Sequence, residues 1–140
     1  MNASFGSSEG PALMKHTIES EDNNYIIVVP TINIANDFYK TFNNKKDSFK
    51  LCINDGAFKD IKLAFDNNVR VILTMHHTAS RCLGSIMDFT HGAILNKYRL
   101  FIDEAHLLLQ HQALREIMRR FNSAGLITAT SRELKNLSAF

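Results

Sequence analysis

Short apolar runs alternate along the chain with longer segments in which apolar residues recur at helical spacing. The short runs predict buried strands, and the periodic segments predict helices. The predicted strands are residues 25–29, 49–53, 69–74, 98–103 and 125–129. The predicted helices are one that begins at Pro11, residues 32–42, 57–65, part of 83–95, 105–121 and a last one that begins at Ser131. Strands that are apolar on both faces and alternate with helices predict an α/β fold, with a parallel sheet covered on both sides.

The composition indicates one soluble domain. Hydrophobic residues make up 45% of the 140 residues, which is ample for a packed core. There is no apolar run long enough to cross a bilayer and no linker, so we expect a single domain over residues 1–140, in the cytoplasm, with no membrane partner. Cys52 and Cys82 lack the spacing of a metal site and are expected to be free thiols. The net charge of +2 neither requires nor excludes a nucleic-acid partner.

Two adjacent carboxylates, Asp103 and Glu104, follow the apolar residues 100–102. The carboxyl end of a parallel strand is where open α/β sheets bind their ligands. There, one carboxylate can hold Mg²⁺ through water while its neighbour orients an attacking water. The same pair also suits a purely structural role, with Asp103 as a helix N-cap and Glu104 in the first helical turn. The local pattern leaves both interpretations open.

Four motifs resemble those of the superfamily 2 helicases. Asp103-Glu104-Ala105-His106 spells the DEAH box of that family. The other three are Val-Val-Pro-Thr at 28–31, similar to motif Ia; residues 71–74 with His76, Thr78 and Arg81, similar to the motif Ib region; and Leu-Ile-Thr-Ala-Thr at 126–130, similar to the Ser/Thr-Ala-Thr motif. The resemblance covers about residues 3–132 and implies the first of the family's two RecA-like domains, which have a P-loop NTPase fold.

The resemblance implies a nucleotide site for ATP and Mg²⁺. Asp103 would coordinate Mg²⁺, and Glu104 would position the hydrolytic water. His106 would contact the motif on the next strand and couple the nucleotide state to domain movement. That motif consists of Thr128, Ala129 and Thr130.

The resemblance also implies contacts with a DNA or RNA backbone where strands end. The implied contact residues are Pro30, Thr31, Thr74, His76, Thr78 and Arg81. Hydroxyl groups and an arginine at strand ends can hold phosphates without reading bases. Several of these residues lie in segment 75–81, which is mostly polar and predicts an irregular junction after the third strand.

The phosphate-binding loop departs from the family pattern Ala-x-x-Gly-x-Gly-Lys-Thr. Residues 3–10 align with it without a gap, so that the loop would consist of Gly6, Ser7, Ser8, Glu9 and Gly10. Glu9 stands at the lysine position, where two unit charges about 4 Å apart interact by roughly 4 kcal/mol at an effective dielectric constant of about 20. Gly10 has no hydroxyl group for Mg²⁺, and Ser8 hinders close backbone approach to a phosphate. We therefore expect no meaningful ATP hydrolysis by this chain alone.

The sequence also departs from the family before this loop. Only Met1 and Asn2 precede Ala3, so we expect the sheet to lack the strand that leads into the loop. Its neighbour in the family, the strand at 125–130, would then have an open edge for a partner protein or a missing segment. Three interpretations stay open: a helicase remnant, a fragment of a longer helicase, and an unrelated, non-catalytic α/β module that binds a partner protein or nucleic acid.

Overall fold

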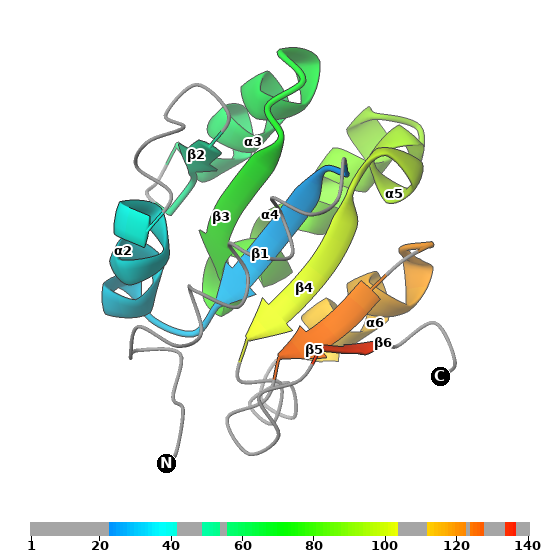
Figure 1. The fold of residues 1–140 in the computed structure, drawn as a ribbon. Coiled ribbons are helices and arrows are strands. Elements are labelled where there is room, and N and C mark those ends of the chain that lie inside the picture. The colour runs from blue at the N-terminus through cyan, green and yellow to red at the C-terminus, as the bar shows by residue number, and fades with distance from the viewer. Residues whose placement is uncertain are drawn as a thin grey trace.

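A six-stranded sheet in the order β2-β3-β1-β4-β5-β6 forms the centre of the described structure (Figure 1). The computed structural model describes residues 23–41, 49–53, 56–103, 112–122, 124–127 and 134–136. The strands are β1 (Tyr25–Val29), β2 (Phe49–Leu51), β3 (Val71–Met75), β4 (Arg99–Asp103), β5 (Ala124–Ile127) and β6 (Leu134–Asn136). The helices are α2 (Ile32–Thr41), α3 (Ala57–Asp66), α4 (His76–Phe89), α5 (Ala93–Lys97) and α6 (Gln112–Arg120). Within these ranges, no helix has the length and apolar character needed to cross a membrane.

The central strand is β1, which pairs in parallel with β3 on one side and with β4 on the other. Strand β2 continues the parallel sheet beyond β3, and β5 continues it beyond β4. All the side chains of β1 are fully buried, as a strand with neighbours on both edges and helices above and below requires. The predicted α/β fold with a parallel sheet is therefore confirmed.

Each face of the sheet has its own hydrophobic core. Alternate strand residues point to opposite faces, so neighbouring apolar residues of β1 contribute to different cores. On the first face, the strands pack against α3, α4, α5 and α6 through Ile26, Val28, Ile72, Leu100 and Ile102. On the second face, they pack against α2 through Tyr25, Ile27, Val29, Leu73 and Phe101. The predicted cover of helices on both sides is thus present, and Figure 1 shows α3, α4 and α5 behind the strands.

The far edge of the sheet corrects two expectations. Residues 134–136 form strand β6 and do not belong to a helix that begins at Ser131. This strand pairs antiparallel with β5, with Leu126 opposite Lys135, so the edge of β5 is not open. The physical reason is that an edge strand presents a row of unpaired N–H and C=O groups, which any nearby extended segment can satisfy. Here the end of the same chain provides that segment.

A third correction concerns residues 75–81, which do not form an irregular junction. Helix α4 begins at His76, directly after β3, and continues to Phe89. The polar composition was misleading because Thr78, Ala79 and Cys82 face the core, whereas His77 and Arg81 face solvent. The predicted helix in 83–95 is divided between α4 and α5 by a turn in which His91 and Gly92 have positive φ angles of 52° and 81°.

Candidate nucleotide and nucleic-acid site

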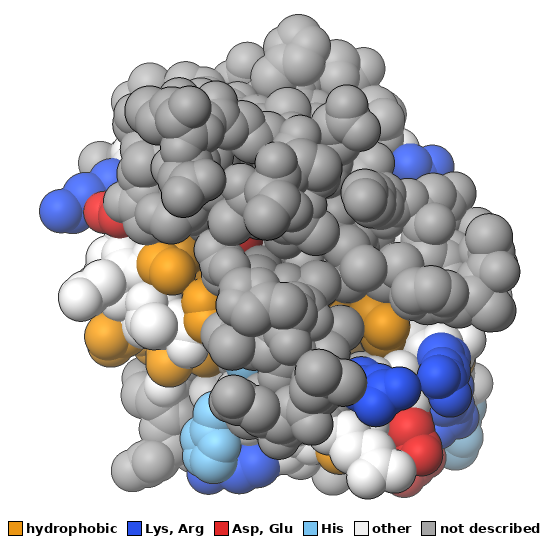
Figure 2. Space-filling view, turned by 90° about the horizontal axis from the view of Figure 1, so that it is seen from below, with side chains coloured by type: hydrophobic (Ala, Val, Ile, Leu, Met, Phe, Trp, Pro, Cys, Tyr) orange, Lys and Arg blue, Asp and Glu red, His pale blue; other side chains and the backbone are white. Residues whose placement is uncertain are grey.

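Three strands end side by side at one edge of the sheet. Val29 of β1 pairs with Met75 of β3, and the preceding residue, Val28, pairs with Ile102 of β4. The next residue of β4, Asp103, therefore lies in the same row as Val29 and Met75. Figure 2 views the molecule from this end and shows histidine surface next to Lys or Arg surface. The fold thus brings together the ends of the three strands that carry motif Ia, the motif Ib region and the DEAH box.

Asp103 is the last residue of β4, and its side chain has no exposed area. It lies between β1 and β5, and pairs with Ile127 of β5. Burial of a carboxylate is costly, and the carboxyl end of a parallel strand is where open α/β sheets bind their ligands. Carboxylate oxygens are ligands that Mg²⁺ prefers, so Asp103 fits this metal chemically. Within the described ranges, no three His, Cys, Asp or Glu side chains cluster in a way that could hold a metal ion.

The side chain of His76 contacts the main chain of Asp103. Its Nε2 lies 2.8 Å from the Asp103 carbonyl oxygen in a buried contact, although β1 separates the two strands concerned. A carbonyl oxygen can only accept, so Nε2 carries the proton and donates it. The ring therefore reaches across the end of β1 and joins the start of α4 to the end of β4. His76 was predicted as a nucleic-acid contact, but its side chain is only 2% exposed.

Thr74 and Thr78 are also buried. The Thr74 hydroxyl donates to the Cys52 carbonyl oxygen at 2.8 Å, and so connects β3 with the residue that follows β2. Thr78 lies on the core side of α4. The predicted contacts Thr74, His76 and Thr78 are therefore not exposed to a ligand in this structure, and the hydrogen bonds of Thr74 and His76 join strand ends within the protein.

Thr31, directly after β1, and Arg81, the sixth residue of α4, have exposed side chains, and Pro30 is half-buried. Thr31 caps α2, since its Oγ1 accepts a hydrogen bond from Ile34 N at 3.3 Å. Arg81 lies on the solvent side of α4, one helical turn after the exposed His77. His77 was not among the predicted contacts, and the structure shows only that it is exposed on the same side of α4 as Arg81. Exposed groups beside two helix N-termini suit phosphate binding.

The remaining predicted site residues lie outside the described ranges. They are Gly6, Ser7, Ser8, Glu9 and Gly10 of the phosphate loop, Glu104 and His106 of the DEAH box, and Thr128, Ala129 and Thr130. By its chemistry alone, Glu9 does not fit a nucleotide, because its charge has the same sign as that of the phosphates.

The two cysteines are free and buried, as predicted for free thiols. Burial raises the pKa of the Cys52 thiol from its ordinary 9.0 to about 12, and Asp60 adds to the shift. Burial also raises the pKa of Cys82, which Arg81 partly offsets. Because the thiolate is the reactive form of cysteine, neither residue is a candidate nucleophile.

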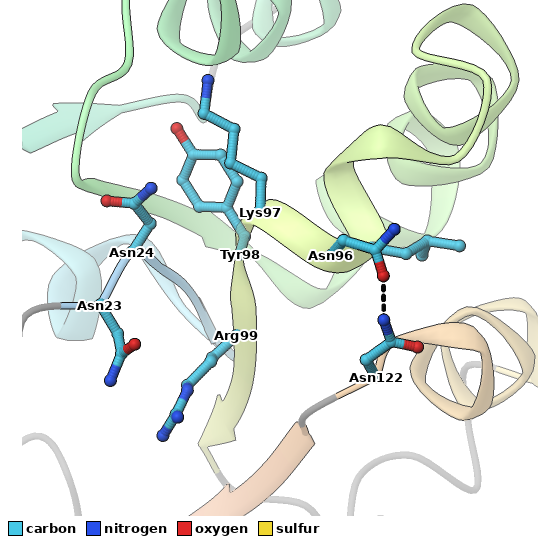
Figure 3. Close-up of a pocket in the computed structure, with 8 residues that line it drawn as sticks. Asn23, Asn24, Asn96, Lys97, Tyr98, Arg99 and Asn122 are labelled. Carbon is cyan, nitrogen blue, oxygen red and sulfur yellow. Dashed lines mark hydrogen bonds between the residues drawn. The ribbon is translucent and has the colours of Figure 1, made fainter.

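A polar pocket lies at the opposite end of the strands, where β1 and β4 begin (Figure 3). Its volume is about 240 Å³, and it is lined by Asn23, Asn24, Leu95, Asn96, Lys97, Tyr98, Arg99 and Asn122. Many of its polar groups are engaged within the protein: Asn122 Nδ2 donates to Asn96 Oδ1, and Lys97 Nζ donates to the Phe65 carbonyl at 2.9 Å. This pocket contains no residue of the predicted site.

The parallel strands with helices on both faces, and the buried carboxylate where β4 ends, are those of an α/β protein with a RecA-like fold. The family model for DEAD/DEAH box helicases matches residues 10–138. The match spans nearly the whole chain, so the protein belongs to the DEAD/DEAH box helicase family. Members of this family use ATP and Mg²⁺ and bind nucleic acid. No curated protein and no solved structure gives a significant match.

Proposed function

We propose that residues 1–140 are a single, partial RecA-like domain: the first motor domain, or a remnant of it, of an ATP-dependent superfamily 2 nucleic-acid helicase. The observation that supports this proposal is the fully buried Asp103 at the carboxyl end of β4, inside a DEAH sequence and within the family match. A buried carboxylate at the ligand-binding end of a central strand has a cost in stability that a metal-binding role explains.

At the nucleotide site, each residue has one task. By the resemblance, Asp103 would hold Mg²⁺, Glu104 would orient the water that attacks the terminal phosphate, and His106 would transmit the nucleotide state to residues 128–130. When bound, Mg²⁺ neutralises charge on the β- and γ-phosphates of ATP. The loop at residues 6–10 is the weak part of this site, because Glu9 repels the phosphates that a lysine would attract.

At the nucleic-acid face, Thr31 and Arg81 contact the phosphate backbone, with Pro30 beside them. The support for this assignment is that Thr31 directly follows β1 and is exposed, and that Arg81 is exposed on α4, the helix that follows β3. His76 and Thr74 make no direct contact with nucleic acid in this proposal, because both are buried and their hydrogen bonds join strand ends within the protein. Thr78 is buried as well and makes no contact in it. The alternative, a non-catalytic module that binds a partner protein, was expected to use an open edge of β5. That edge is not open, because β6 pairs with β5.

Calorimetric titration with Mg·ATP tests the proposal on the natural chain and on Glu9→Lys/Gly10→Thr. We expect negligible binding by the natural chain and clear binding by the double variant. Asp103→Asn in the same background is the matched control and should remove the dependence on Mg²⁺. If the double variant keeps an intact fold by circular dichroism but does not bind Mg·ATP, the motor-domain proposal is contradicted. Clear binding by the natural chain would contradict the role given to Glu9.

A further inference from the structure

The hydrogen-bond ladder between β1 and β4 cannot be completed at Asp103. The ladder starts where Arg99 N donates to the Asn24 carbonyl at 2.8 Å, and the strands keep one register from Tyr25↔Arg99 to Val28↔Ile102. In a parallel pair, each strand donates at every second residue. With this starting point, the β1-side donor for the Asp103 carbonyl would be residue 30. Residue 30 is proline, which has no N–H group.

His76 supplies a donor at this position. Its Nε2 donates to the Asp103 carbonyl at 2.8 Å, from a ring that is almost fully buried. A buried carbonyl oxygen left without a donor is costly, and the ring comes from the far side of β1, beyond the proline that leaves the gap. His76 and Pro30 are thus two halves of one arrangement, in which a side chain replaces a missing main-chain donor.

We propose that His76 is a positioning residue of the nucleotide site, which holds the main chain of Asp103 and so the direction of its carboxylate. The proposal rests on the function proposed above, because the metal-binding role of Asp103 gives the bond its consequence. His76 opens α4, which also carries the exposed Arg81. The same ring therefore connects the nucleic-acid face to the magnesium ligand.

The test is a cycle of variants of the full chain, followed by amide hydrogen exchange in NMR spectra. In His76→Leu, we expect the Asp103 amide to exchange about tenfold faster, because the end of β4 opens more often when its carbonyl has lost a donor. Amides at the other end of the ladder, such as that of Arg99, should keep their rates. In His76→Leu/Pro30→Ala, the rate at Asp103 should return toward that of the natural chain, because residue 30 regains an N–H group. His76→Gln, which keeps a donor, should be intermediate.

Two controls separate positioning from general support of the core. Thr78→Val changes another buried polar residue of α4, only 3% exposed, and should leave exchange at Asp103 unchanged. Long-range ¹H–¹⁵N spectra of the natural chain should show the His76 ring protonated on Nε2. A ring protonated on Nδ1 alone, an unchanged Asp103 rate in His76→Leu, no recovery with Pro30→Ala, or uniform acceleration of all amides would each overturn the proposal. If His76→Leu does not fold, the proposal is tested by the exchange rate of the Asp103 amide in His76→Gln and by the ring spectrum of the natural chain.

The calorimetry described above keeps the two proposals distinguishable. In the Glu9→Lys/Gly10→Thr background, adding His76→Leu should weaken Mg·ATP about tenfold and leave metal-free ATP unchanged. An equal loss with and without Mg²⁺ would count against positioning. No nucleotide binding in that background, together with the expected exchange cycle, would contradict the motor-domain proposal and leave the role of His76 in holding Asp103 supported.

Discussion

The Thr74 hydroxyl donates to the Cys52 carbonyl oxygen across 2.8 Å, and both residues are fully buried. Thr74 belongs to a strand end that resembles a nucleic-acid-binding motif, yet its hydroxyl faces the interior. Its polar group is therefore used within the sheet, where it supports the start of the segment that follows β2.

Replacement of Thr74 should affect stability and not nucleic-acid affinity. Thr74→Val removes the hydroxyl donor while it keeps the shape of the side chain, so we expect the free energy of unfolding to fall by about 1 kcal/mol. Urea denaturation followed by circular dichroism measures this loss. Fluorescence anisotropy with a labelled single-stranded oligonucleotide should show that Thr74→Val binds with the same affinity as the natural chain. A marked drop in that affinity without a loss of stability would contradict the buried role of Thr74.

Replacement of Arg81 should have the opposite profile. Arg81 is exposed on α4, so Arg81→Ala should weaken oligonucleotide binding, and the slope of log affinity against log salt should become shallower by about one unit. Stability should change by less than about 0.5 kcal/mol, as for most surface substitutions. Arg119→Ala changes another exposed arginine, on α6, and serves as the control. Equal effects of the two substitutions would show that binding depends on net charge and not on this face.

The pKa of Cys52 predicts a loss of stability at alkaline pH. Its value is raised to about 12 in the folded protein from an ordinary 9.0, so the neutral thiol is favoured by folding. The contribution of this thiol to the free energy of unfolding is therefore fully present below pH 9. It is lost as pH rises toward 12, with a slope that approaches about 1.4 kcal/mol per pH unit. Tyr98, whose pKa burial raises to about 12, acts in the same direction. Urea midpoints between pH 8 and 10 should fall less steeply in Cys52→Ala than in the natural chain, and identical slopes would contradict the buried thiol.

Because β6 pairs with β5, we expect the protein to be a monomer only while β6 stays in place. Because alternate residues of a strand donate to its neighbour, Leu134→Pro/Lys135→Pro removes a ladder donor whichever residue provides it. We expect the exposed edge of β5 to promote self-association that rises with protein concentration. Sedimentation velocity measures this, and Leu134→Ala/Lys135→Ala is the control that keeps both N–H groups. A doubly proline-substituted chain that stays monomeric would argue that β6 does not protect the edge.

Much of the fold could be predicted because its strands are short, apolar and separated by helical periodicity. The central strand was predicted with its observed bounds, Tyr25–Val29, since a strand buried on both faces is a continuous apolar run. The predictions failed where polar residues lie inside the core or where pairing is distant. Helix α4 begins with polar residues whose burial depends on the sheet beneath them, and β6 pairs with β5, a strand that local periodicity does not indicate as its partner.

The sequence by itself determined the class of protein, because the DEAH tetrapeptide, the Thr-Ala-Thr segment and the alternation of strands and helices are local patterns. It also determined that residue 30 has no N–H group to donate. Only the tertiary structure decided which motif residues face solvent and which residue replaces that donor. His76 and Asp103 are neighbours because β1 lies between β3 and β4, and strand order in a parallel sheet is set by long crossover connections that no local pattern encodes.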